Sequence, residues 1–162
     1  MGSNRITVVD AGPIIHLDQI DSLQLLSVFD SVVVPETVYK ELSAGEIPEN
    51  LGNLEYEIRT AEGDTAYEGL DKGETAALQL AEISEADPVF LTDDLDAREQ
   101  SNQLDIEVHG SIGIIVLNFS QGDLKFDEAV SLMRRLQEET QLFVTEAVVE
   151  RGIDRLRELQ QG

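Results

Sequence analysis

The chain has 162 residues, of which 33 are Asp or Glu and 11 are Lys or Arg, so its formal net charge at pH 7 is −22. This length and a hydrophobic content of 41% suffice for one compact domain with a core, and are too small for two comfortable ones. Because the chain has no cysteine, a disulfide framework, a thiolate metal site and a cysteine nucleophile are all excluded.

The first part of the chain predicts alternating strands and helices. A β-branched segment that ends at Asp10 is typical of a short buried strand, and the helical apolar spacing that follows is interrupted near Asp21. After a second strand, a helix begins at Pro35 and ends at Gly45. The first three predicted elements are a strand at 6–10, a helix at 14–29 and a strand at 31–35.

The middle of the chain, residues 46–70, is predicted to be a loop with a possible short strand at Tyr56–Arg59. The elements predicted after it are a helix at 71–83, a strand at 89–92, a helix at 94–103, a strand at 105–110, a helix at 111–122 and amphipathic helices at about 127–139 and 145–160. Strands that alternate with helices predict an α/β fold, a three-layer α/β/α sandwich with a mostly parallel central sheet. We expect a single domain over 1–162, with the helices at about 127–160 packed on it.

The surface charge and the N-terminus predict where the protein works. The acidic residues are dispersed and few of the basic residues are lysines, which is the pattern of proteins in concentrated salt, where repulsion is screened over about 3 Å at 1 M. The N-terminal MGSNRITVVD has no basic segment followed by an apolar one, and no apolar run approaches the roughly 18 residues that span a bilayer. We therefore expect a halophilic source, a cytoplasmic location and no membrane partner.

Acidic residues follow two of the predicted strands. Asp10 follows the first strand, and Asp93 and Asp94 follow the strand at 89–92. Ligands of open α/β sheets collect outside the carboxyl ends of the strands, so these acids meet at one edge if the two strands are neighbours. A carboxylate directly after a buried strand is costly unless it is paired or bound to a metal.

Helix positions add further acids, each with a simpler alternative. Glu74 lies on the apolar face of its helix, where it completes a capping box with Asp71, serves as a ligand, or does both. Glu41 flanks an apolar face and is alternatively a solvated boundary residue. Asp96 is either a first-turn charge or a reserve ligand. Several carboxylates in one pocket cannot all stay ionised without a cation, and oxygen ligands favour Mg²⁺ or Mn²⁺.

The chain resembles the PIN-domain ribonucleases, and most closely their archaeal and bacterial toxin-like branch. The motifs occur in the family's order over essentially the whole chain: VDAGPII, VVVPETVYKEL, LDKGETAALQLA, FLTDDLDAR and VHGSIGIIVLNFSQGDL. The resemblance assigns catalytic and metal-binding roles to Asp10, Glu41, Glu74 and Asp94, with Asp96 as the fallback ligand. Ala11 and Gly12 stand where many members carry a hydroxyl.

The resemblance implies a metal-dependent endoribonuclease that cuts single-stranded or structured RNA with Mg²⁺ or Mn²⁺. It also implies a homodimer and, often, a toxin whose small antitoxin protein blocks the acidic pocket with a basic side chain. The alternatives are a non-catalytic PIN-like module that binds nucleic acid or protein, and a DNA-directed nuclease or phosphatase.

Few basic residues are placed to bind a nucleic acid. Arg98 follows Asp94 by one helical turn, so it either pairs with Asp94 or contacts a substrate phosphate. Thr92 and Ser111 are the other candidate substrate-binding residues. We expect His16 and His109 to be structural. The net charge weighs against nucleic-acid binding, which basic patches usually announce.

The charge predicts that the stability of the fold depends on salt. Self-repulsion among carboxylates destabilises the compact state at low ionic strength and is screened as KCl is added. The melting temperature should therefore rise across a KCl series. A melting temperature that is indifferent to salt would contradict the halophilic interpretation.

Overall fold

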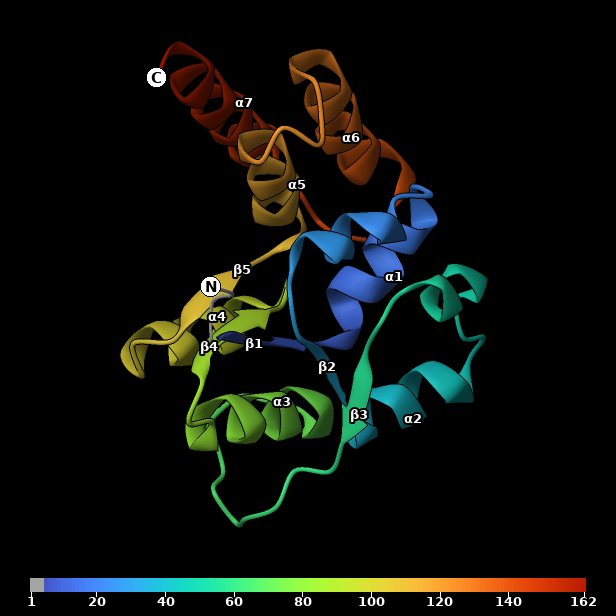
Figure 1. Ribbon diagram of the computed structural model, residues 1–162, viewed down its shortest axis with the longest axis vertical. Helices are drawn as coiled ribbons and strands as arrows, with labels where there is room; N and C mark the ends of the chain where they lie inside the picture. The colour runs from blue at the N-terminus through green and yellow to red at the C-terminus, as the bar shows by residue number, and fades with distance from the viewer. Residues whose placement is uncertain (1–4) are drawn as a thin grey trace.

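A five-stranded sheet organises the fold in the computed structural model, which describes residues 5–162 (Figure 1). The strands are β1 (Arg5–Val9), β2 (Val32–Pro35), β3 (Glu57–Arg59), β4 (Asp87–Leu91) and β5 (Glu107–His109). They lie in the order β3-β2-β1-β4-β5, and all four pairings are parallel. The sheet is thus wholly parallel, where the sequence predicted a mostly parallel one.

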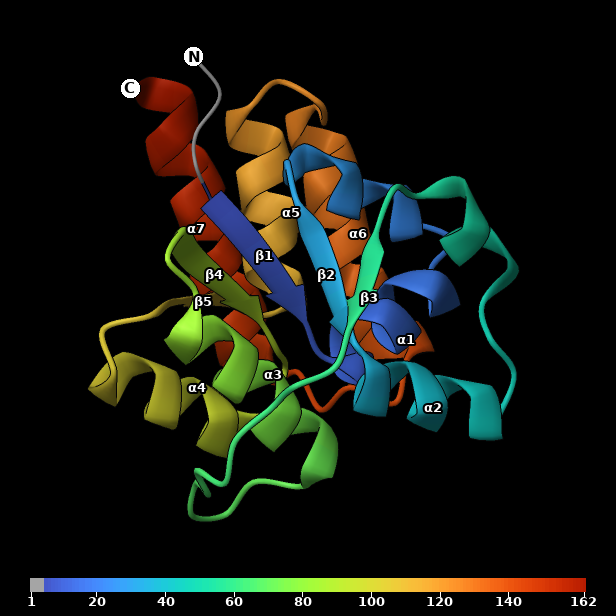
Figure 2. The ribbon, with the colours of Figure 1, turned by 60° about the horizontal axis from the view of Figure 1, so that its bottom comes forward.

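Helices cover both faces of this sheet, which confirms the predicted sandwich (Figure 2). The helices are α1 (Ala11–Gln19), α2 (Glu36–Ala44), α3 (Lys72–Ile83), α4 (Leu95–Gln103), α5 (Ser111–Ser120), α6 (Phe126–Glu139) and α7 (Glu146–Gln161), with 3-10 turns η1 (Leu23–Val28) and η2 (Glu49–Asn53). In the described part of the chain, no helix is both long and apolar enough to cross a membrane.

Alternation along the strands divides the core into two clusters. In β4, Leu91 packs against the cluster formed with α1, α5, α6 and α7, whereas Phe90 packs against the cluster formed with α3 and α4. Successive strand residues point to opposite faces, so both faces of a parallel sheet must be apolar. Met133 of α6 and Leu156 of α7 are fully buried in the first cluster.

Two residues with positive φ mark where regular elements are interrupted. The interruption predicted near Asp21 is confirmed, because α1 ends at Gln19, Asp21 has φ 53° and the chain restarts as η1. The strand predicted at 105–110 begins at Glu107, because Asp105 has φ 56°. The left-handed region is open to Asp more than to most residues, and it ends a regular element. The 3-10 turn η2 was not predicted.

The sheet order makes β1 and β4 neighbours over their whole length. Arg5 to Val9 pair with Asp87 to Leu91 in parallel register. Just beyond the paired residues, the Asp10 N–H donates to the Leu91 carbonyl (2.9 Å). The condition for the acids to meet is therefore fulfilled, because the segments that follow β1 and β4 leave the sheet at the same edge.

Candidate functional site

Asp10 is the most deeply buried acid at this edge, with an exposed fraction of 6%. It caps the N-terminus of α1, where Oδ1 accepts a hydrogen bond from the Ala11 N–H (2.8 Å). Its Oδ2 accepts from the Thr92 hydroxyl (2.9 Å). Although Ala11 has no side-chain hydroxyl, both oxygens of Asp10 are therefore held in place.

Thr92 connects two of the predicted ligands. It follows β4 and is fully buried, and its hydroxyl oxygen accepts a hydrogen bond from the Asp94 N–H (3.2 Å) while donating to Asp10. Asp94 then caps α4 by accepting from the Ala97 N–H (2.9 Å). One hydroxyl thus fixes the positions of two acids that lie more than 80 residues apart in sequence.

Glu74 both caps its helix and belongs to the acidic group at this edge of the sheet, which consists of Asp10, Glu41, Asp71, Glu74 and Asp94. Its backbone N–H donates to Asp71 Oδ1 (2.8 Å), and its Oε1 accepts from the Asp71 N–H (3.0 Å), so the capping box is complete. The Glu74 side chain nevertheless points inward and is 8% exposed. The two sequence interpretations of Glu74, cap and inward carboxylate, therefore hold together.

Glu41 reaches the same place from α2. A β-carbon on Gly73 would lie 2.6 Å from Glu41 Oε1, so the carboxylate can approach the start of α3 only because residue 73 is glycine. Burial and the charge of Asp71 raise the pKa of Glu41, and the hydrogen bond from the Gly73 backbone opposes them. Glu41 is exposed on its other side, toward solvent.

The pKa values show that these acids lie within electrostatic reach of one another. Burial raises the pKa of Asp10 to about 6, against the hydrogen bonds of Ala11 and Thr92 and with the help of Asp71 and Glu41. Burial raises the pKa of Glu74 to about 7, and the charges of Asp10, Asp71 and Asp94 add to it.

No cation offsets this charge in the part of the chain that the structure describes. The ion pairs there involve none of the four predicted ligands or Asp71. Asp71 is the member of the group that the sequence interpretation used only as a helix cap. The signal that identifies it is its position three residues before Glu74, at the same helix start.

Asp93, which lies between Thr92 and Asp94 in the turn after β4, has a structural role. Asp93 accepts hydrogen bonds from the backbone N–H and the hydroxyl of Ser111 (both 2.6 Å), and His16 Nδ1 lies 2.8 Å from its Oδ2. Asp93 therefore ties the start of α4 to α5 and α1. His16 has the structural role expected of it. Ser111 is fully buried, as is Thr92, so the structure gives both hydroxyls positioning roles rather than an exposed surface for substrate.

Asp96 and Arg98 project from the exposed side of α4. The Asp96 carboxylate lies against Gly69, where a β-carbon would be 3.4 Å from Oδ2, and it is not among the charges that raise the pKa of Asp10 or Glu74. Within residues 5–162, no ion pair joins Arg98 to Asp94. Arg98 Nη1 instead lies beside Gly110, where an added β-carbon would be 3.5 Å from it. Arg98 remains the exposed candidate for contact with substrate.

The acidic group fits a hard divalent cation by its chemistry. It offers only carboxylate oxygens, the ligands preferred by Mg²⁺ and Mn²⁺. As placed among residues 5–162, no three acidic or histidine side chains converge closely enough to hold a metal. Mg²⁺ is usually held by one or two protein carboxylates plus water, and Asp10, Glu41, Glu74 and Asp94 are the predicted residues that would supply them.

Comparison with known proteins gives one match. A family model for the PIN domain matches residues 6–158. No curated protein and no solved structure matches the chain at a significant level.

The raised pKa of Glu74 predicts that this residue destabilises the metal-free fold at neutral and alkaline pH. The pKa of Glu74 is about 7 in the folded protein and 4.5 ordinarily, so its ionisation favours the unfolded chain. The resulting loss of stability is complete above about pH 7 and disappears as the pH falls toward 4.5. Glu74→Gln keeps a capping-box residue and removes the charge. At pH 8, the melting temperature of the metal-free variant should be several degrees higher than that of the wild type, since each kcal/mol of stability shifts it by roughly 2–4 °C. Near pH 4.5, the two proteins should have the same melting temperature.

The control for this melt is Glu138→Gln, which removes the same charge from an exposed position on α6. It should change the melting temperature little at either pH. An equal rise in both variants would show that general charge reduction, and not the environment of Glu74, is responsible.

The Thr92 bridge predicts that a hydroxyl is required at this buried position. Thr92→Val leaves the Asp94 N–H and Asp10 Oδ2 without a partner, which should cost about 1–3 kcal/mol in the free energy of unfolding. Thr92→Ser keeps the hydroxyl and should cost less. Denaturant unfolding of both variants measures the difference, and equal stabilities would refute the bridge.

Proposed function

Because the chain belongs to the PIN-domain family, whose members are typically nucleases, we propose that it is a metal-dependent endoribonuclease that hydrolyses phosphodiester bonds in single-stranded or structured RNA. The observation that carries the proposal is the uncompensated acidic group at the carboxyl edge of β1 and β4. Its buried members, Asp10 and Glu74, have pKa values raised to about 6 and about 7. A polar site with perturbed carboxyls at this edge of an α/β sheet is characteristic of catalysis.

Asp10, Glu41, Glu74 and Asp94 are the proposed ligands of Mg²⁺ or Mn²⁺, with Asp96 in reserve. When bound, such an ion polarises a phosphoryl oxygen and lowers the pKa of a water molecule. The chain itself supplies the arrangement of the ligands. Thr92 holds Asp10 and Asp94, the Asp71 N–H holds Glu74, and the Gly73 backbone holds Glu41.

The proposed substrate is RNA, and Arg98 is the proposed contact to a phosphate near α4. In concentrated salt, the repulsion between RNA and a chain of charge −22 is screened, so local contacts decide binding. We further propose a homodimer, and a role as the toxin of a toxin–antitoxin pair in the cytoplasm of a halophile. The family membership supports an interaction with nucleic acid, and the charge of −22 supports the halophilic source.

The second candidate function is a non-catalytic module that binds nucleic acid or protein. The observation that favours it is that, among residues 5–162, no three potential ligands converge as they would at a formed metal site. Calorimetry separates the two candidates, because a metal-dependent nuclease must bind Mn²⁺. An absence of binding at millimolar Mn²⁺ would favour the module.

The endoribonuclease proposal predicts that the purified protein degrades RNA in high salt with Mn²⁺. It also predicts that Asp10→Asn and Asp94→Asn abolish cleavage. Asn is as good a helix cap as Asp, so both variants should stay folded. The loss should exceed about 100-fold, since outer-shell changes at metal sites already cost roughly 10–100-fold. Gel assays of cleavage, with circular dichroism as the test of folding, measure both.

Three comparisons make this assay specific. Asp96→Asn should retain more activity than either ligand variant, because Asp96 is only the reserve ligand. Digestion of RNA, single-stranded DNA and a phosphomonoester side by side separates a ribonuclease from a DNA-directed nuclease or a phosphatase. Cleavage at the wild-type rate by both Asp10→Asn and Asp94→Asn would refute the site.

A further inference from the structure

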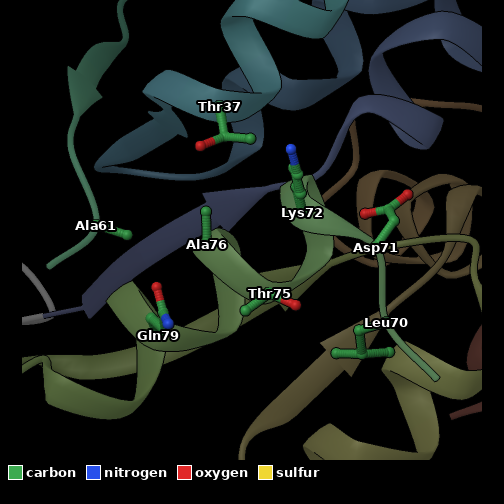
Figure 3. A pocket seen from close by; sticks show the side chains of 8 residues that line it. All are labelled: Thr37, Ala61, Leu70, Asp71, Lys72, Thr75, Ala76 and Gln79. Carbon is green, nitrogen blue, oxygen red and sulfur yellow. The ribbon is translucent and has the colours of Figure 1, made fainter. Parts of the chain in front are cut away.

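An open pocket of about 330 Å³ adjoins the acidic group between α2 and α3 (Figure 3). Thr37 lines it from α2, Leu70 from the loop before α3, and Lys72 and Thr75 from the first turns of α3. Figure 3 shows the Lys72 side chain extending toward α2, the helix that carries Thr37. The volume is in the range of small-molecule sites, about 300–1,000 Å³.

Asp71 makes the pocket continuous with the acidic group. It lines the pocket at the start of α3, and its charge raises the pKa of Asp10, Glu41 and Glu74. A molecule in the pocket would therefore be next to any cation that these acids hold. The pocket is then an extension of the proposed active site and not a separate cavity.

The ammonium group of Lys72 has no partner among the described residues. Its ammonium group makes no ion pair or hydrogen bond within residues 5–162, whereas Lys40 is paired with Glu36 at 2.7 Å. Lys72 is also the first residue of α3, where the helix dipole disfavours a positive charge. Lys72 therefore does not stabilise its own helix, and its free ammonium lines the pocket.

The other lining groups suit a nucleotide. The hydroxyls of Thr37 and Thr75 are half-buried and, among the described residues, take part in no hydrogen bond. Hydroxyls and an ammonium group are donors that the oxygens of a phosphate can accept. The apolar residues of the lining include Leu70 and the buried Ala76, which a sugar or base can contact.

We propose that this pocket binds the nucleotide adjacent to the scissile phosphodiester, with the phosphate of that nucleotide on Lys72 and the two threonines. The inference rests on the proposed ribonuclease function and extends it. In a chain of charge −22, an RNA strand that crosses an acidic site needs cations beside it. Lys72 supplies one on the α3 side, and Arg98 supplies one on the α4 side.

The first test measures RNA binding in the Asp10→Asn variant, at a salt concentration at which it is folded. The probe is a fluorescently labelled single strand of about ten nucleotides, within the usual range of single-strand sites. Adding Lys72→Ala should weaken binding about tenfold and lower the salt slope by about 1. The melting temperature should stay the same or rise, because a cation leaves a helix N-terminus.

Lys125→Ala is the matched control. It removes the same charge from the segment before α6, which belongs to the helices on the opposite face of the sheet from α3. It should leave RNA affinity unchanged. Equal affinities for the Lys72→Ala and Lys125→Ala proteins would overturn the inference.

The second test uses the shortest substrates with otherwise wild-type protein. A dinucleoside monophosphate has only the scissile phosphate, so Lys72→Ala should not change its cleavage. Adding one terminal phosphate, at the 5′ or the 3′ end, supplies the group for the pocket. For one of these two substrates Lys72→Ala should raise KM about tenfold with kcat unchanged, and that substrate identifies the side of the scissile bond.

The outcomes separate this inference from the proposed function. If the wild type binds RNA without cleaving it, the ribonuclease proposal falls and the comparison of Lys72→Ala with Lys125→Ala still decides the pocket. If RNA is cleaved but neither extended substrate depends on Lys72, the inference falls alone. A fall in kcat without a change in KM or affinity would place Lys72 with the acidic group and would also overturn it.

Discussion

The Thr92 hydroxyl accepts a hydrogen bond from the Asp94 N–H within its own turn and donates one to Asp10, and the contact with Asp10 depends on the pairing of β1 with β4. A shift of one residue in that register would move every side chain of β4 to the other face and separate the two acids. The register is fixed by the core itself, since Phe90 and Leu91 are fully buried on opposite faces. Core packing thus sets the geometry of the acidic group.

The acidic group is tolerated because its members also do structural work. Asp10, Asp71 and Asp94 each cap a helix, so the backbone N–H groups at the starts of α1, α3 and α4 all face the same edge. Helix N-termini carry partial positive charge, which offsets part of the repulsion among the carboxylates. The remaining imbalance is visible in the raised pKa values of Asp10 and Glu74. Cap and ligand are therefore compatible roles of one residue.

Local sequence patterns predicted the helices and strands better than the contacts between them. The alternation of strands and helices, the interruption near Asp21 and the capping box of Glu74 are local, and the structure has all three. No local pattern could predict that β1 and β4 are neighbours, because strand order depends on long-range packing. Asp71 was predicted only as a cap, since its part in the acidic group arises from contacts of α3 with the edge of the sheet. The roles of Thr92 and Ser111 depend on partners distant in sequence and were not predictable from spacing.

The capping aspartates also have a genetic consequence. Aspartate and asparagine codons differ by a single base, and asparagine is as good a helix cap as aspartate. One transition at Asp10 or Asp94 can therefore remove a carboxylate from the edge of the sheet while the helix that begins there is retained. Whatever chemistry these acids perform is open to loss in one mutational step with the fold intact. A population that carries this gene can therefore generate copies that lack one of these carboxylates and still fold.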